Sequence, residues 1–207
     1  MRKPLTVGQR LSAEVFKTVT KLLVGYTPDF FDELIATMGV AGFMKWSGHL
    51  DKVMKDLDAQ WGHAVGQVLV GAAAMWNGCQ YCGVGHTFAG NLAWFREHGS
   101  LLPFSERDVP RLQRMTDDDA RQELRRMLAE PQYQRLSGLL ERLYALKYED
   151  VQPATAQDEL LQRTIAAWDL VNECSILSAI EPNEVEPLSP ISKDKTLIAR
   201  YLAAREG

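Results

Sequence analysis

The chain has 207 residues, a formal net charge of −4 and a sequence pI near 5.6. Its 46% hydrophobic and 24% charged residues are typical of a folded globular protein, which excludes the disordered, collagen-like and coiled-coil classes. The acidic balance offers no attraction to a polyanion, so we expect neither nucleic acid nor a membrane surface as a partner.

The length predicts a single domain over residues 1–207. The first residues are basic, but polar residues follow at once, so there is no apolar core of a signal peptide and export is not indicated. Three cysteines are too few for a disulfide scaffold and fit a reducing compartment. We therefore expect a cytoplasmic protein.

The N-terminal part of the chain shows helical periodicity. Val15, Val19, Leu22 and Leu23 recur at helical spacing, and Thr27-Pro28-Asp29 opens the next apolar segment. No stretch of the chain alternates like a strand. The pattern predicts an all-α fold.

Residues 59–95 contain no Asp, Glu, Lys or Arg, although charged residues are plentiful on both sides. Such a stretch must be largely buried, and its glycines and amides interrupt it too often for a membrane span. We expect one helix over about residues 57–76, a break at Asn77-Gly78, and a second helix that starts near Cys79. Residues 59–98 would thus form a buried pair of helices.

The second half of the chain is richer in charge. Acids, bases and leucines alternate over residues 117–148 and predict a solvated helical hairpin in which the charges are structural. A strong helix should run over about 155–180, followed by an extended crossing at 181–190 and a last helix at about 193–205. Residues with capping or first-turn preferences mark the helix starts, and they are Ser105, Thr116, Pro131 and Thr155.

The chemistry concentrates at the start of the second buried helix. Cys79 and Cys82 are three positions apart, so they share one side of a helix, and His86 lies one turn beyond Cys82. A helix N-terminus lowers the pKa of a thiol, and an imidazole can accept its proton. The spacing favours Cys82 as the attacking thiolate, because it is nearest to His86, and Cys79 as the thiol that resolves the product to a disulfide.

The pattern C-x-x-C-x-x-x-H at the start of a buried helix resembles the AhpD-like (alkylhydroperoxidase D) proteins of the carboxymuconolactone decarboxylase superfamily. The resemblance covers about residues 59–97. It implies an all-helical homo-oligomer that reduces alkyl hydroperoxides without a cofactor, with Cys82 peroxidatic. It also implies regeneration by a dithiol reductant, lipoyl-type or thioredoxin-like.

One position departs from the family pattern. The family places a glutamate of the proton relay twelve residues before the first cysteine, and Gln67 stands there. Gln67 can orient His86 or a water but cannot take a proton, which puts peroxidase activity in doubt. We hypothesise that His63, one turn earlier on the same face, replaces the carboxylate, and we interpret Trp76 and Tyr81 as pocket walls.

Four alternatives stay open. Cys79, Cys82 and His86 could bind zinc with Cys174 or His63 as a fourth ligand, although the chain has no second C-x-x-C or H-x-x-x-H pair. The chain could instead be a decarboxylase-like enzyme, but such members generally lack the cysteine pair. It could also be a redox sensor or oligomeric scaffold without catalysis. A purely structural disulfide would close too short a loop to stabilise the fold much.

Overall fold

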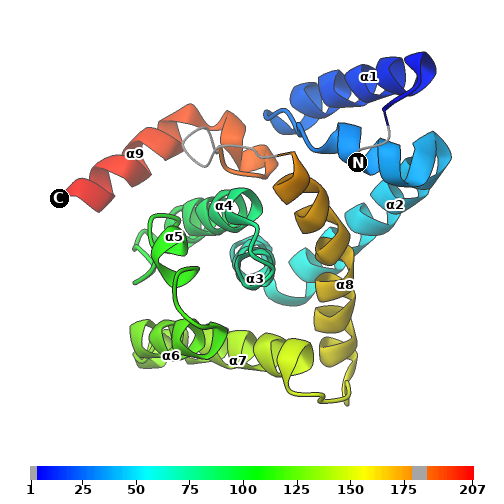
Figure 1. The fold of residues 1–207 in the computed structure, drawn as a ribbon. Helices are drawn as coiled ribbons and strands as arrows, with labels where there is room; N and C mark the ends of the chain where they lie inside the picture. Colours follow the sequence, from blue (N-terminus) through cyan, green and yellow to red (C-terminus); the bar gives the residue numbers. More distant parts are fainter. Residues whose placement is uncertain (1–3, 179–185) are drawn as a thin grey trace.

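The computed structural model describes residues 4–178 and 186–207. Within these residues 78% are helical and no strand occurs, which confirms the all-α prediction (Figure 1). The longer helices, in chain order, are α1 (Val7–Val24), α2 (Phe31–Trp61), α3 (His63–Trp76), α4 (Gln80–His98), α6 (Asp117–Met127), α7 (Gln134–Tyr148), α8 (Ala156–Leu177) and α9 (Lys195–Glu206). Short helical turns are α5 (Val109–Leu112), η1 (Pro131–Tyr133) and η3 (Pro190–Lys193).

Helix α3 lies near the centre of Figure 1, and α2, α4, α7 and α8 all pack against it. Almost every residue of α3 is buried, as is most of α4, so the charge-free stretch does form the core of the fold. Uncharged side chains can fill the core because, unlike a buried ion, they need no partner of opposite charge.

Helices α3 and α4 approach each other closely at two glycines. A Cβ on Gly71 would lie 2.5 Å from Oγ1 of Thr87 and 2.8 Å from its backbone nitrogen. A Cβ on Gly90 would lie 2.7 Å from Cγ2 of Val68. Larger residues at either position would force the two helices apart, so these glycines set the distance at which the two halves of the site face each other.

The predicted start of α3 is wrong. The sequence predicted one helix over residues 57–76, whereas α2 ends at Trp61 and α3 begins at His63. Gly62 joins them with φ 85°, a conformation that glycine adopts without strain. The predicted break at Asn77-Gly78 is confirmed, with Gly78 at φ 76°.

The charged hairpin over residues 117–148 is confirmed as α6, η1 and α7. Thr116 and Thr155 cap α6 and α8 as predicted, and Pro131 begins η1. Ser105 is not a helix cap, because its N–H and hydroxyl donate to the Asp108 carboxylate in the turn before α5.

The C-terminal helix α9 begins two positions later than predicted, at Lys195. Of the predicted crossing, residues 181–185 lie outside the described residues, as does the predicted end of the preceding helix at position 180. Where the chain is described again, Leu188 N donates to the Gly85 carbonyl at 3.1 Å, so this segment packs onto α4.

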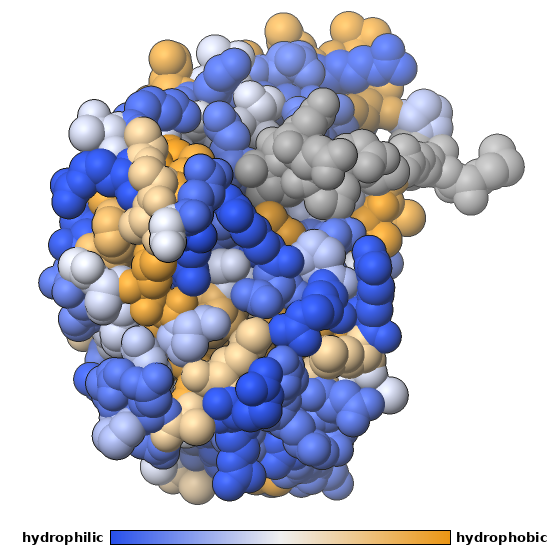
Figure 2. Space-filling model, turned by 90° about the vertical axis from the view of Figure 1, so that its left-hand side faces the viewer, coloured by the Kyte–Doolittle hydropathy of each residue, from blue (hydrophilic) through white to orange (hydrophobic). Residues whose placement is uncertain are grey.

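No helix in residues 4–178 or 186–207 is both long enough and apolar enough to cross a membrane. One side of the molecule is mostly polar, with apolar atoms projecting along its upper edge at the height of α1 (Figures 1 and 2).

Candidate redox site

The cysteine pair lies at the beginning of α4. Cys79 occupies the N-cap position, and its sulfur accepts the backbone N–H of Cys82 at 3.4 Å. The turn Asn77-Gly78 reverses the chain from α3 and delivers Cys79 to this position. Both side chains are buried, with 1% exposed, and both are free thiols.

The surroundings of the two sulfurs separate their pKa values. The Cys82 thiol and N–H both donate to Cys79, which lowers the pKa of Cys79 in spite of its burial. Burial and the negative charge on Cys79 raise the pKa of Cys82 well above its usual value. The first thiolate of this pair therefore forms on Cys79, with Cys82 as its hydrogen-bond donor.

Helix α8 supplies further polar contacts. Ser175 Oγ lies 3.3 Å from the Cys82 sulfur, and the Asn172 amide lowers the pKa of both cysteines. The Oδ1 atom of Asn172 accepts from Asn77 Nδ2 at 2.7 Å. Its Nδ2 group is buried without a well-formed hydrogen bond in the described part of the chain, so this donor is available to a thiolate.

A cation fixes the orientation of these amides. Lys147 of α7 donates to Oδ1 of Asn77, which leaves the Asn77 amide N–H groups to donate to Asn172 and to Asp169. Lys147 thereby connects the charged hairpin to the buried site through Asn77 and Asn172.

His86 lies in contact with Gln67 and Trp168. The Trp168 indole N–H can only donate, and it points at Nε2 of His86 at 3.4 Å, so Nδ1 carries the ring proton and donates to Oε1 of Gln67 at 2.8 Å. Burial, with a smaller effect from His63, lowers the pKa of His86 to about 3. The imidazole is therefore neutral, and both of its nitrogens have partners other than Cys82.

His63 is the first residue of α3, and its ring nitrogens bond to residues other than His86 and Gln67. Its Nδ1 donates to Asp58 at 3.1 Å and its Nε2 accepts from the Ser189 hydroxyl at 2.8 Å. His63 is one helical turn before Gln67, but its ring nitrogens are engaged with Asp58 and Ser189, so the role of replacement base that the sequence suggested for it stays a hypothesis.

The series Asp58, His63 and Ser189 has the order of a hydrolase triad. However, Ser189 is only 2% exposed and its oxygen accepts the N–H of Ile191, which places it at the start of η3. We assign this series a structural role: it joins the C-terminal segment to the junction of α2 and α3.

The predicted pocket walls, Trp76 and Tyr81, are buried in packing contacts. Trp76 packs against Tyr144 of the hairpin at 5.3 Å between ring centroids, and Tyr81 packs against Phe30 at 6.2 Å. Burial raises the pKa of Tyr81, and its proximity to Cys79 and Cys82 raises it further. Tyr81 therefore forms part of the apolar surroundings of the pair.

A surface pocket of about 330 Å³ lies beside the cysteines. Asn172 lines this pocket and also acts on both cysteines, so this side chain stands between the pocket and the pair. Its other lining residues combine polar and apolar side chains, namely Asn77, Asp169, Glu173, Ile176 and Leu177.

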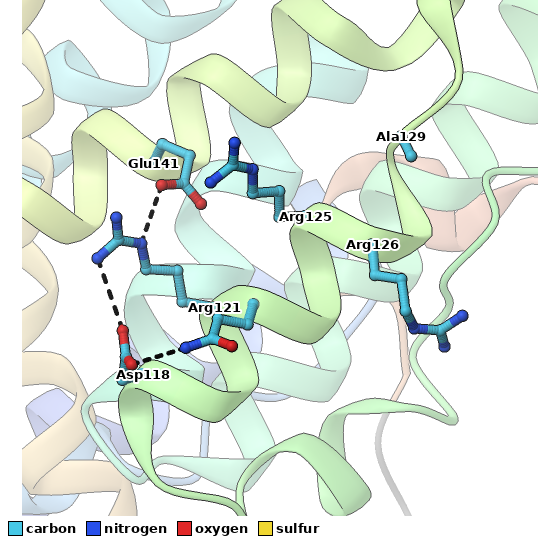
Figure 3. Close-up of a pocket in the computed structure, with 7 residues that line it drawn as sticks. Asp118, Arg121, Arg125, Arg126, Ala129 and Glu141 are labelled. Carbon is cyan, nitrogen blue, oxygen red and sulfur yellow. Dashed lines mark hydrogen bonds and ion pairs between the residues drawn. The ribbon is translucent and has the colours of Figure 1, made fainter.

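A larger pocket of about 530 Å³ lies on the charged hairpin (Figure 3). Arg121 pairs there with Glu141 and Asp118, and Arg126 pairs with Glu123. Arg121 and Arg126 already have carboxylate partners, and Arg125 alone does not define a binding site, so we assign no ligand to this pocket.

No group of three or more His, Cys, Asp or Glu residues in the described part of the chain is arranged to hold a metal ion. The zinc alternative would need Cys174 or His63 beside the pair. Instead, the side chain of Cys174 contacts Thr37, and His63 is bonded to Asp58 and Ser189.

Sequence reasoning missed three residues of α8 that touch the site, Trp168, Asn172 and Ser175. A signal for them exists: these three share one helical face with Leu161 and Ile165, so an amide and a hydroxyl occur where the period demands apolar residues. Polar side chains in the buried phase of a helix point to a partner across the core.

Comparison of the chain with protein-family models, with curated proteins and with solved structures finds no match.

Proposed function

We propose that this chain is a thiol-dependent oxidoreductase that cycles Cys79 and Cys82 between a dithiol and a disulfide, without a bound cofactor. The observation that carries the proposal is the Cys79 sulfur, which caps α4 and accepts hydrogen bonds from Cys82 in a buried site. The resemblance of the C-x-x-C-x-x-x-H pattern to AhpD-like proteins supports the same class of chemistry.

The attacking group in this proposal is Cys79. The spacing favoured Cys82 because His86 could serve as its base, but the nitrogens of His86 are bonded to Gln67 and Trp168 and its pKa is lowered to about 3. Cys79 needs no such base, since its thiolate is stabilised by Cys82 and Asn172.

The reaction that fits best is thiol–disulfide exchange. The Cys79 thiolate attacks one sulfur of a substrate disulfide, the S–S bond breaks, and a substrate thiolate leaves. Cys82 then gives its proton to that thiolate and attacks the Cys79 sulfur, which releases the second half of the substrate as a thiolate and forms the Cys79–Cys82 disulfide. An external dithiol, lipoyl-type or thioredoxin-like, reduces the pair again.

Reduction of alkyl hydroperoxides is the second candidate. Both sulfurs are 1% exposed, so an oxidant of either class must reach them through a movement of the surrounding side chains. Attack by the thiolate breaks the O–O bond, the alcohol leaves with a proton, and the sulfenic acid on Cys79 reacts with the Cys82 thiol to give the disulfide and water. Gln67 provides no acid for the leaving oxygen, so we expect this reaction to be the slower of the two.

Stopped-flow oxidation of the reduced protein by oxidised glutathione and by cumene hydroperoxide tests the proposal. The wild type should lose both thiols of the pair, with the greater second-order rate constant for glutathione disulfide. Cys79→Ser should lower that rate constant by roughly 100-fold or more, whereas Cys82→Ser should trap a glutathione adduct on Cys79 that mass spectrometry detects.

Cys174→Ser is the matched control and should react like the wild type, because Cys174 lies outside the pair and burial raises its pKa to about 11. An adduct trapped on Cys82 in Cys79→Ser, with no reaction in Cys82→Ser, would reverse the two roles. A wild type that keeps both thiols with both oxidants would end the redox proposal.

A further inference from the structure

Helix α1 has apolar side chains on two opposite faces. The inner face packs on α2, where Ala13 is buried and Phe16 stacks on Phe43 with 4.9 Å between ring centroids. The outer face carries large apolar side chains that are 45–86% exposed, namely Val7, Leu11, Val15, Val19, Leu22 and Leu23. A helix that is apolar on both sides requires a partner on each.

The outer face has no charged residue among these side chains. By helical period, the residues that share the face are Gly8, Ser12 and Thr18, while Arg10, Glu14 and Lys21 fall along one edge. Single exposed apolar residues are ordinary on protein surfaces, but a continuous row along a whole helix marks an interaction surface.

The row is also held in place. Lys193 donates to the carbonyls of Leu22 and Leu23, Ser192 donates to that of Val24, and Lys17 pairs with Asp32 of α2. These bonds attach both the middle and the C-terminal end of α1 to the rest of the fold. The exposed face is therefore preformed, and a partner would bind it without the cost of first ordering the helix.

We propose that the outer face of α1 is the interface through which two copies of this chain associate about a two-fold axis. This inference does not depend on the chemistry of the cysteines. Apolar residues stand at the middle and at both ends of the row, so a two-fold axis near Val15 places Leu11 of one copy near Val19 of the other. The same axis places Val7 near Leu22, so apolar groups meet apolar groups along the whole helix.

The size of the face fits a second copy. Given its exposed fractions, the row offers on the order of 600 Å² per chain, or about 1,200 Å² for a pair, which reaches the range of specific protein interfaces. A bilayer fits less well, because helices that lie on membranes present a face rich in Lys and Arg. Of the three basic residues of α1, Lys17 is neutralised by Glu14 and Asp32, which leaves two, Arg10 and Lys21, and the chain carries a net charge of −4.

Sedimentation velocity of the full chain at increasing concentration tests the interface. The wild type should sediment as a species of twice the 23.3 kDa chain mass. Val15→Arg should raise the dimer dissociation constant by roughly 100-fold or more, because it places two like charges at the axis. Its thermal midpoint, measured on the monomer, should stay unchanged, since the position is exposed and arginine is a good helix former.

Gly138→Arg adds the same charge to α7, on the other side of the molecule in Figure 1, and should leave the dimer intact. In addition, Val15→Cys should cross-link to itself through a short bis-maleimide, whereas Gly138→Cys should not. Gly138→Cys carries the same three native cysteines, so it also measures their background.

A wild type that remains a monomer at about 100 μM would overturn the proposal, since that is far above the dissociation constants of specific complexes. A dimer that Val15→Arg leaves intact would overturn it as well. Flotation of a monomeric wild type with phosphatidylcholine–phosphatidylglycerol vesicles, lost in Val15→Arg, would instead assign the face to a membrane.

Discussion

The buried pair α3–α4 and the charged hairpin α6–α7 show two ways in which one chain places its polar groups. On the hairpin, opposite charges shift the carboxylates: Arg126 of α6 lowers the pKa of Glu123 to about 2, and Arg142 of α7 lowers that of Asp158 at the start of α8. In the buried helices α3 and α4, burial has the larger effect on His86 and lowers its pKa to about 3.

The difference explains where chemistry is possible. Paired charges near solvent are fixed in their ionised forms at neutral pH and react little. Between the buried helices α3 and α4 water is excluded, so small changes in hydrogen bonding decide whether a thiol or an imidazole is charged. The hairpin affects this site through Lys147, which orients Asn77 and Asn172.

The largest expected effect that separates the two regions is the pH dependence conferred by His86. The unfolded chain binds a proton at this group near pH 6.5 and the folded chain only near pH 3, so between these values the unfolded chain holds more protons and acid favours unfolding. The free energy of unfolding should fall by about 1.4 kcal/mol per pH unit below pH 6 from this group alone.

Urea unfolding of the wild type and His86→Gln between pH 4.5 and 7.5 measures this slope. The variant should show a flatter dependence, even if its stability at pH 7 is lower. The pKa values of Glu123 and Asp158 are lowered as well and act with the same sign, but they contribute mainly below about pH 5, where the carboxylates of the unfolded chain begin to bind protons. Equal slopes in both proteins would mean that His86 is not a buried neutral imidazole.

The next largest effect is a difference in packing between a buried glycine of α3 and an exposed glycine of α7. Gly71→Ala should lower the free energy of unfolding by about 1–3 kcal/mol, because the new methyl group would collide with Thr87 of α4. The same change at Gly138 meets nothing within 4 Å on an exposed face of α7 and should stabilise the protein by up to about 1 kcal/mol. Thermal and urea unfolding of both variants check this contrast, and a shift of the same sign in both would contradict it.

The smallest effects concern the ion pairs of the hairpin. Asp158→Asn should destabilise by about 1–2 kcal/mol, because Asp158 holds Arg142 through two bonds and also accepts the N–H groups of Ala154 and Thr155 at the start of α8. Arg126→Gln, which breaks an exposed pair with Glu123, should leave the urea midpoint unchanged. An equal loss of stability in both variants would contradict this, because it would mean that the N–H groups bonded to Asp158 contribute no stability beyond an ion pair.

Most helices could be predicted from the sequence, because the signals that start and end them are local. Thr116 and Thr155 are strong N-caps, and the turn at Asn77-Gly78 uses a glycine with positive φ. Gly62 was missed, since a lone glycine between two buried helical runs has the same local appearance as a glycine inside one helix.

The sequence by itself determined the helical class, the burial of residues 59–95, and the closeness of Cys79 and Cys82, because each depends on residues a few positions apart. Only the tertiary structure decided what surrounds the pair. Ser175 is 93 positions from Cys82, and Trp168 is 82 positions from His86, so their contacts depend on how α8 packs across α3 and α4. Those contacts engage both nitrogens of His86 and favour Cys79 as the thiolate. Hydrogen bonding and burial set a pKa only after the chain has folded around the group.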